Sequence, residues 1–261
     1  MSSLSEVLAD FRAECDALDA VLVALDEDGW HKETPAVGWD TRDTVGHLAD
    51  TSDIMFNSVT GTGPDLMEQA QLASEISGVQ WDGPDAVDAF TAVQMQKVRQ
   101  VPWNEVHEWW HRATDRLIDT IAGLDEGGRY RWGPNMISPK SLVSARQMET
   151  WAHSLDIHAA AGVPYTDTDR IYHVAFLGLR AMPHAFTLER KEMPGAIRLE
   201  LVSPSGAQWS LGPDDAPTVI SGSASDFCRV VARRDRDGAA ERLVGAGPDA
   251  ALAIEHGRAF L

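Results

Sequence analysis

Two side chains on one predicted helix, Glu149 and His153, have the types and spacing needed to hold a divalent cation. Residues four apart on a helix point the same way, so the carboxylate and the imidazole would lie one turn apart on one face. Asp156, three residues beyond the histidine, could accept a hydrogen bond from its ring and orient it. The same spacing also suits an ordinary glutamate–histidine pair on a helix flank, so a metal site requires a third ligand from elsewhere.

The segment 138–162, which carries this pair, has the start and stop signals of a helix. Ser138 is a good N-cap, Pro139 fits the first helical position, and Gly162 ends the segment. We expect an apolar stripe beside a polar one that lies at the edge of the buried surface. The apolar stripe comprises Leu142, Ala145, Met148, Ala152, Leu155 and Ala159, and the polar stripe comprises Arg146, Glu149, His153 and Asp156. The pattern leaves open whether Arg146 is a cation in a cavity or a surface charge.

A third candidate ligand, His47, lies on a second predicted helix that begins after Asp40 and runs to about Val59. Asp40 is a good N-cap, and Asp43 three residues later fits a capping box. The apolar face of this helix comprises Val45, Leu48, Ile54 or Met55, and Val59. A lone histidine beside such a face is usually structural, so His47 becomes a candidate ligand only through the acid–histidine pair described above.

Other histidines and the cysteines carry weaker signals. His107 and His111 are also four apart, and they could approach a cavity, although surface or interhelical hydrogen bonding is the favoured interpretation. His158 lies too far round its helix to join the candidate ligands. The chain has two cysteines, Cys15 and Cys228, both in apolar periodic segments, and we expect inert core thiols. Two cysteines cannot make a disulfide framework or a cysteine-rich zinc site.

The composition narrows the classes of partner. The chain has 261 residues, a hydrophobic share of 44% and a formal net charge of -18. This acidic balance argues against a nucleic-acid backbone or an anionic membrane surface as partner. No apolar run is long enough to span a bilayer, and the N-terminal residues lack the features of a secretion signal. We therefore expect a cytoplasmic protein with a small-molecule substrate, and the sequence does not decide between a monomer and a homodimer.

The order of predicted elements indicates two domains. Four long helices are expected at 5–25, 40–59, 102–123 and 138–162, with shorter segments at 65–77 and 85–100 and loops between them. This pattern is typical of a helix bundle, which builds metal sites from facing helices. After Pro164 a helix at 168–186 precedes strands at 196–203, 207–211 and 218–221 and helices at 223–234 and 248–256. The prediction is an α+β, mainly α protein with a bundle at 1–165 and an α+β domain at 166–261.

Two motifs resemble a known family. Gly38-Trp39-Asp40, followed by Asp43, Val45, His47 and Leu48, is similar to the first motif of the mycothiol-dependent maleylpyruvate isomerase family. The segment from Glu149 through His153 to Asp156 looks like the second motif of that family. The family belongs to the wider DinB-like metal-binding superfamily of four-helix bundles. The resemblance covers about residues 5–165 and extends into a C-terminal domain of sterol-carrier-like type.

The resemblance implies that His47, Glu149 and His153 hold one divalent metal. Two histidines and a carboxylate suit zinc with an open coordination position, and they also suit iron or nickel. In the family, the metal activates the thiol of mycothiol, because a bound cation lowers a thiol's pKa. The thiolate adds to an electron-poor double bond, which leads to isomerisation or S-transfer on a small, carboxylated electrophile.

The family isomerase also uses an arginine from its C-terminal domain. The segment from Gly222 to Arg234 resembles the family's segment, and its register implies that Arg234 is that arginine, with Arg233 as the next candidate. Here Arg233 stands where the family has a glycine. An arginine in this place could clamp a substrate carboxylate through two hydrogen bonds. The alternative is a solvated basic end of a helix.

Two further hypotheses stay open at this stage. The metal could act as a Lewis acid without a thiol, in a lyase, cyclase or hydrolase reaction. Alternatively, the protein could be a metal-containing binding module for a small apolar ligand. Its 9 Trp and 8 Met suit a cavity and suit a core equally well.

Overall fold

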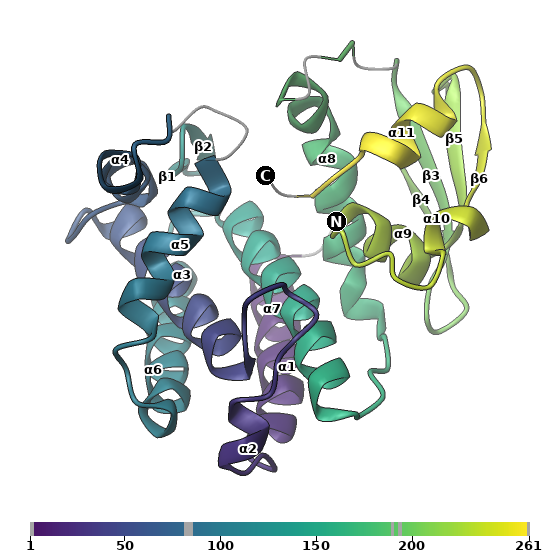
Figure 1. The fold of residues 1–261 in the computed structure, drawn as a ribbon. Coiled ribbons are helices and arrows are strands. Elements are labelled where there is room, and N and C mark those ends of the chain that lie inside the picture. The colour runs from purple at the N-terminus through teal and green to yellow at the C-terminus, as the bar shows by residue number, and fades with distance from the viewer. Residues whose placement is uncertain (1–2, 81–85, 189–190, 193–194, 260–261) are drawn as a thin grey trace. The chain divides into compact units, whose positions relative to one another are not determined.

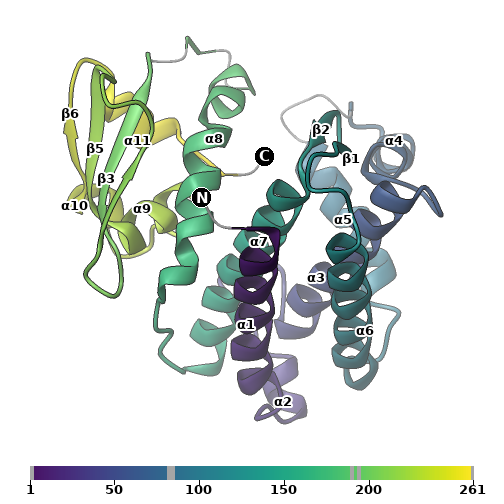
Figure 2. The ribbon, with the colours of Figure 1, turned by 180° about the vertical axis from the view of Figure 1, so that it is seen from behind.

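The computed structural model of the chain describes residues 3–80, 86–188, 191–192 and 195–259. These residues form two compact units, Met1–Pro164 and Tyr165–Leu261. The first unit is mainly helical, and the second combines helices with a four-stranded sheet (Figures 1 and 2). The predicted α+β, mainly α class is therefore confirmed. Among the described residues, no helix has both the length and the apolarity required to cross a bilayer.

Four long helices dominate the first unit: α1 (Leu4–Leu22), α3 (Thr41–Thr60), α6 (Trp103–Ala122) and α7 (Pro139–Ala161). Helix α3 packs along α6, and α1 packs along α7 (Figure 1). Large side chains fill the space between the four helices and are withdrawn from solvent, among them Phe11, Leu18, Leu48, Trp110 and Leu142. The apolar periodicity of each helix thus forms one shared core.

Shorter elements connect these helices: α2 (Glu27–Trp30), α4 (Leu66–Ser77), α5 (Ala86–Val98), and an antiparallel hairpin of β1 (Tyr130–Trp132) and β2 (Asn135–Ile137). The shorter segment predicted at 65–77 is the helix α4. The loops predicted before residue 40 and before residue 138 contain α2 and the hairpin. The first long helix ends at Leu22 rather than Leu25. The predicted start of α5 at Asp85 lies outside the described residues.

The predicted N-caps of α3 and α7 are present. Asp40 accepts a hydrogen bond of 2.7 Å from the backbone N–H of Asp43, and Ser138 caps α7 through the N–H of Ser141. The predicted capping box at α3 is wrong, because the Asp43 carboxylate does not return to the cap. It accepts hydrogen bonds from the guanidinium groups of Arg42 and Arg99 instead. Charged donors outcompete a backbone N–H for a carboxylate.

The second unit begins with a short 3-10 turn (Asp169–Ile171) and helix α8 (Tyr172–Leu188). Its sheet has the order β4-β3-β5-β6, in which β3 runs parallel to β5 and the other pairs are antiparallel. Helices α9 and α11 pack on this sheet, and α8 packs against both helices. The remaining bounds are β3 (Ile197–Val202), β4 (Gln208–Leu211), β5 (Thr218–Ser223), α9 (Ala224–Val231), α10 (Ala239–Arg242), β6 (Val244–Ala246) and α11 (Ala250–His256).

Candidate metal centre

Helices α3 and α7 bring His47, Glu149 and His153 together. The Nε2 atom of His47 lies 3.5 Å from Oε2 of Glu149, and the Nε2 atom of His153 lies 3.5 Å from the same oxygen. All three donor atoms lie within 4.8 Å of one another. A single cation at about 2.0–2.2 Å from each atom is compatible with this spacing after small side-chain movements. The juxtaposition required by the sequence hypothesis is therefore present, and metal binding itself stays a prediction.

The tautomer of His47 is fixed by Gln94, a residue of α5. The Nδ1 atom of His47 lies 2.8 Å from Oε1 of Gln94, whose Nε2 atom donates to Oδ2 of Asp50 at 3.0 Å. Because an ionised carboxylate can only accept, the amide nitrogen must face Asp50 and the amide oxygen must face the ring. Nδ1 therefore carries the proton, and the lone pair of Nε2 points toward Glu149.

The ring of His153 is oriented in the same way by Asp156. Its Nδ1 atom lies 3.2 Å from Oδ2 of Asp156, a fully buried residue one turn further along α7. This contact assigns the proton to Nδ1 and leaves Nε2 as a ligand atom. Trp39, from the loop before α3, lies against both imidazoles, with ring centres 5.0 Å from His47 and 5.9 Å from His153. Both histidines are thus held in position by neighbouring side chains.

The protonation states also suit a cation. Partial burial alone would raise the pKa of Glu149, but in the metal-free protein hydrogen bonds and charge from the protonated forms of His153 and His47 hold it well below its usual range. Burial lowers the pKa of His47 below its ordinary value. An ionised carboxylate and an unprotonated imidazole are the forms that bind a metal. The residues present therefore fit a divalent cation with an open coordination position.

This arrangement leads to an expected pH dependence. Protons compete with a metal for imidazole nitrogen, and the lowered pKa of His47 means that this competition begins at a lower pH than usual. We expect the apparent zinc affinity, measured by competition with a chelator, to fall steeply only below the ordinary histidine pKa of about 6.5. A steep loss of affinity already above that pH would contradict the assignment.

The structure corrects the predicted faces of α7. Arg146, expected at the edge of the buried surface, is only 1% exposed, and Asp156 is fully buried. Leu155 of the predicted apolar stripe is half-buried, and Ala159 is exposed. The helix is covered on several sides, so its polar stripe lies deeper than parts of its apolar stripe. Arg146 is therefore not a surface charge.

The environment of Arg146 is unusual for a guanidinium group. Its Nη2 atom donates to the carbonyl oxygen of Leu48 at 3.1 Å. Within the described part of the chain, its Nε and Nη1 atoms are buried without a hydrogen-bond partner. Burial lowers the pKa of Arg146, while the charge of Glu149 acts in the opposite direction. Arg146 thus supplies a positive charge beside Glu149, the acidic candidate ligand.

Sequence reasoning missed two residues of the centre. Gln94 lies 47 residues from His47, and an uncharged amide in a helical pattern gives no signal of its own. Trp39 belongs to the first motif, so its place beside the ligands could have been proposed from the motif.

The other candidates lie elsewhere. His158 contacts the carbonyl oxygen of Val163 near the end of α7, at 3.2 Å. Cys15 and Cys228 are buried, and burial raises the pKa of both thiols far above neutrality. The protein's own cysteines are therefore poor sources of a reactive thiolate.

Arg234 follows α9 in the second unit, where its Nη1 atom donates to the carbonyl oxygen of Ala232 at 3.0 Å. Arg233 has a φ of 58°, a left-handed backbone conformation that glycine adopts most easily. The position that is glycine in the family thus keeps a glycine-like backbone here. The assignment of Arg234 as the family's arginine and its catalytic role both stay predictions.

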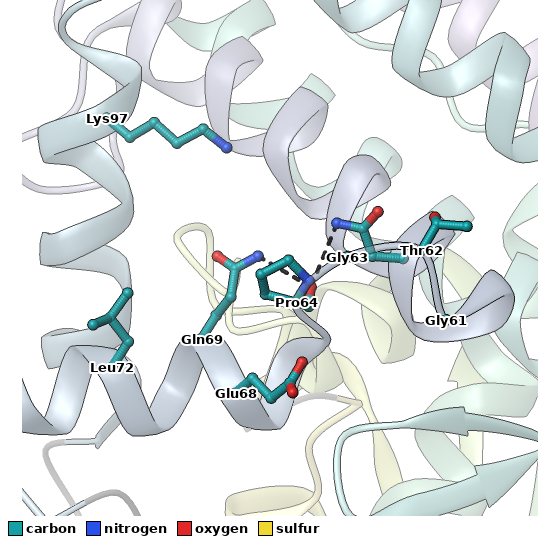
Figure 3. Close-up of a pocket in the computed structure, with 9 residues that line it drawn as sticks. Gly61, Thr62, Gly63, Pro64, Glu68, Gln69, Leu72 and Lys97 are labelled. Atoms are coloured by element: carbon teal, nitrogen blue, oxygen red, sulfur yellow. Dashed lines mark hydrogen bonds between the residues drawn. The ribbon is translucent and has the colours of Figure 1, made fainter.

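A surface pocket adjoins the network behind His47. The loop of Gly61–Pro64, residues of α4 and Lys97 of α5 line it (Figure 3). The Lys97 ammonium also pairs with the Asp50 carboxylate that binds Gln94. The pocket therefore shares one residue with this hydrogen-bond network, while none of its lining residues is a candidate metal ligand.

Gly46, next to His47, allows α5 to approach α3 closely. A Cβ atom at this position would lie 2.3 Å from Cγ1 of the fully buried Val98. We expect Gly46→Ala to lower the free energy of unfolding by about 1–3 kcal/mol, because overpacking exceeds the gain in helix propensity. Urea denaturation measures this change. The control is Gly123→Ala, where the added Cβ would lie no closer than 3.6 Å to its neighbours, and equal midpoints for the two variants would contradict the expectation.

The fold and the cluster define a helical unit with a two-histidine, one-carboxylate group, followed by a small α+β unit. Residues 11–158 match the family described as the mycothiol maleylpyruvate isomerase N-terminal domain. The chain therefore belongs to this family, which confirms the resemblance inferred from the two motifs.

Two sets of relatives were found. The chain is 35% identical over 236 residues to Mycobacterium tuberculosis proteins named uncharacterized protein Rv0036c and, in a second strain, MT0041, covering 90% of this chain and 87% of each relative. Its fold is similar to the crystal structure of the mycothiol-dependent maleylpyruvate isomerase, with a TM-score of 0.59 and 15% identity over 94% of this chain and 93% of that one. A histidine-to-alanine mutant of that isomerase gives a TM-score of 0.58 with the same identity and coverage.

Proposed function

We propose that this protein is a metal-dependent enzyme that uses a low-molecular-weight thiol of the mycothiol class. The reaction is isomerisation of, or S-transfer to, a small carboxylated electrophile. The observation that carries the proposal is the convergence of His47, Glu149 and His153. Membership of the family and the fold shared with a mycothiol-dependent maleylpyruvate isomerase support the same conclusion.

The ligand set favours zinc, and iron or nickel would also suit it. When bound, the cation supplies a lowered thiol pKa, so that thiolate is present near neutral pH. The chain's residues keep the two Nε2 lone pairs directed at one point through Gln94 and Asp156. Because Cys15 and Cys228 are buried with raised pKa values, the proposal takes the thiol from a cosubstrate.

The second unit contributes Arg234 in this proposal. Its guanidinium group would bind the substrate carboxylate with paired hydrogen bonds. The support is its register in the family segment and the left-handed backbone of the preceding residue. The proposal also assigns the first unit to the DinB-like bundle fold and the second to the sterol-carrier-like type.

The test uses cobalt-substituted full-length protein and mycothiol. We expect mycothiol to produce a sulfur-to-cobalt charge-transfer band, and S-methylated mycothiol to produce none. The band should be absent in His47→Ala, which lacks a candidate ligand. If mycothiol gives neither a band nor thermal stabilisation of the metal-loaded wild type, the thiol-dependent function is rejected. Thiol-independent Lewis-acid chemistry and a metal-containing small-ligand binding protein would then be the remaining interpretations of a metal-loaded centre.

A further inference from the structure

A second cluster of metal-binding side chains lies between α1 and α6. Asp19 comes from α1, and His107 and His111 come from successive turns of α6. Oδ1 of Asp19 lies 2.6 Å from Nε2 of His107 and 2.8 Å from Nε2 of His111. The two Nε2 atoms lie 3.1 Å apart. Three donor atoms therefore form a small triangle, and one point above it lies about 2.0–2.2 Å from all of them, the range of zinc–ligand bonds.

The two imidazole nitrogens are crowded against one carboxylate oxygen. Oδ1 of Asp19 can accept a hydrogen bond from both Nε2–H groups, but the two donor nitrogens then lie only 3.1 Å apart. If one nitrogen is unprotonated, its lone pair faces the Asp19 carboxylate at hydrogen-bond distance. A cation above the triangle makes all three contacts favourable, because each atom then donates a lone pair to it.

The surroundings hold the two imidazoles in place. The ring of His107 lies 5.7 Å from that of Trp30 and is stacked 6.2 Å from that of Trp110. The ring of His111 lies 5.0 Å from Trp110, and both tryptophans are buried. Rings fixed by packing lose little conformational freedom when they bind an ion, which favours affinity.

The cluster is also open to solvent. The side chains of Asp19, His107 and His111 are 30%, 25% and 45% exposed. An ion can therefore enter from water, and water can complete its coordination.

We propose that Asp19, His107 and His111 form a second divalent-cation site, separate from the centre between α3 and α7. Two imidazoles and one carboxylate favour zinc, and they also bind nickel, cobalt and copper. Both sites follow one plan, in which a pair four residues apart on one helix meets a third ligand from a neighbouring helix. The second site joins α1 to α6 and stabilises the first unit, and it does not depend on the proposed enzymatic reaction.

The test measures zinc stoichiometry in the full-length protein after treatment with a chelator. We expect two equivalents in the wild type, one in His111→Gln and one in His47→Ala. The glutamine amide can still donate to Asp19, so His111→Gln removes the imidazole and retains a hydrogen bond. His158→Gln is the matched control, because His158 is a half-buried histidine that belongs to neither cluster. This variant should retain two equivalents of zinc. The proposal would be overturned if His111→Gln still bound two equivalents of zinc. It would also be overturned if the wild type bound one equivalent and His47→Ala bound none.

A second measurement isolates the site. In His47→Ala, we expect zinc to raise Tm and copper to quench tryptophan fluorescence, because Trp30 and Trp110 lie beside the histidines. Both effects should be absent in His47→Ala/His111→Gln. If His47→Ala does not fold, the His111→Gln variant alone tests the site. It should bind one equivalent of zinc fewer than His158→Gln, and copper should quench its tryptophan fluorescence less. Equal quenching and equal zinc content in these two variants would refute the site.

Discussion

The Glu149→Gln variant is expected to lose the metal of the centre between α3 and α7 and, with it, at least about three orders of magnitude in turnover. The Nε2 atoms of His47 and His153 both face Oε2 of Glu149, which supplies the negative charge of the site. Glutamine keeps the shape of the side chain and removes that charge. A bound cation contributes several kcal/mol of charge stabilisation, and each 1.4 kcal/mol is worth about a factor of ten in rate.

Metal analysis and steady-state kinetics with mycothiol check this expectation, with maleylpyruvate, named for the structural relative, as the first test electrophile. Circular dichroism must accompany them, because Arg146 loses part of its compensating charge in the variant. His158→Gln serves as the control and should retain both metal and turnover. A folded Glu149→Gln protein that keeps the metal of this centre and wild-type turnover would show that the carboxylate is not a ligand.

The Gln94→Leu variant is expected to bind metal at the same centre about 10–100-fold more weakly than the wild type. Leucine has a similar volume but cannot accept the proton of His47 Nδ1, so the ring is no longer held in the tautomer that directs Nε2 at the site. Groups that orient metal-binding histidines commonly contribute this much to affinity. The loss should appear in a chelator competition assay without a change in the number of sites.

Thr51→Val is the matched control for this experiment. Thr51 Oγ1 lies 3.3 Å from Gln94 Nε2, so the substitution removes one contact of the amide and leaves its bond to Asp50. We expect a change of less than about threefold, since the glutamine keeps its orientation. Equal losses in Thr51→Val and Gln94→Leu would mean that packing, rather than the tautomer of His47, determines the affinity.

The local signals of the long helices were strong enough to predict most of the first unit. Ser138 and Gly162 bound α7 as expected, and the spacing of Glu149 and His153 places both candidate ligands on one face. Such signals depend on neighbours in sequence, so they specify where a helix begins and which residues share a side. His47, on the predicted helix at 40–59, was the third candidate ligand, and the two motifs indicated the family.

What the sequence could not specify was how the helices cover one another. Helical periodicity separates Arg146 from the apolar stripe, but it does not say that the polar side is buried more deeply. The role of Gln94 depends on the packing of α5 against α3, which involves residues far apart in the chain. The contacts of His107 and His111 with Asp19 likewise depend on the packing of α1 against α6, which the sequence did not specify.

The buried guanidinium of Arg146 has a consequence for the order of assembly. It supplies an internal countercharge to Glu149, so this candidate ligand is already partly neutralised in the metal-free protein. Folding can therefore precede metallation, and removal of the ion by a chelator should leave far-ultraviolet circular dichroism unchanged. If the candidate centre forms before it binds a cation, the ion would come from the surrounding pool, and the cellular metal supply would help to determine which ion is bound.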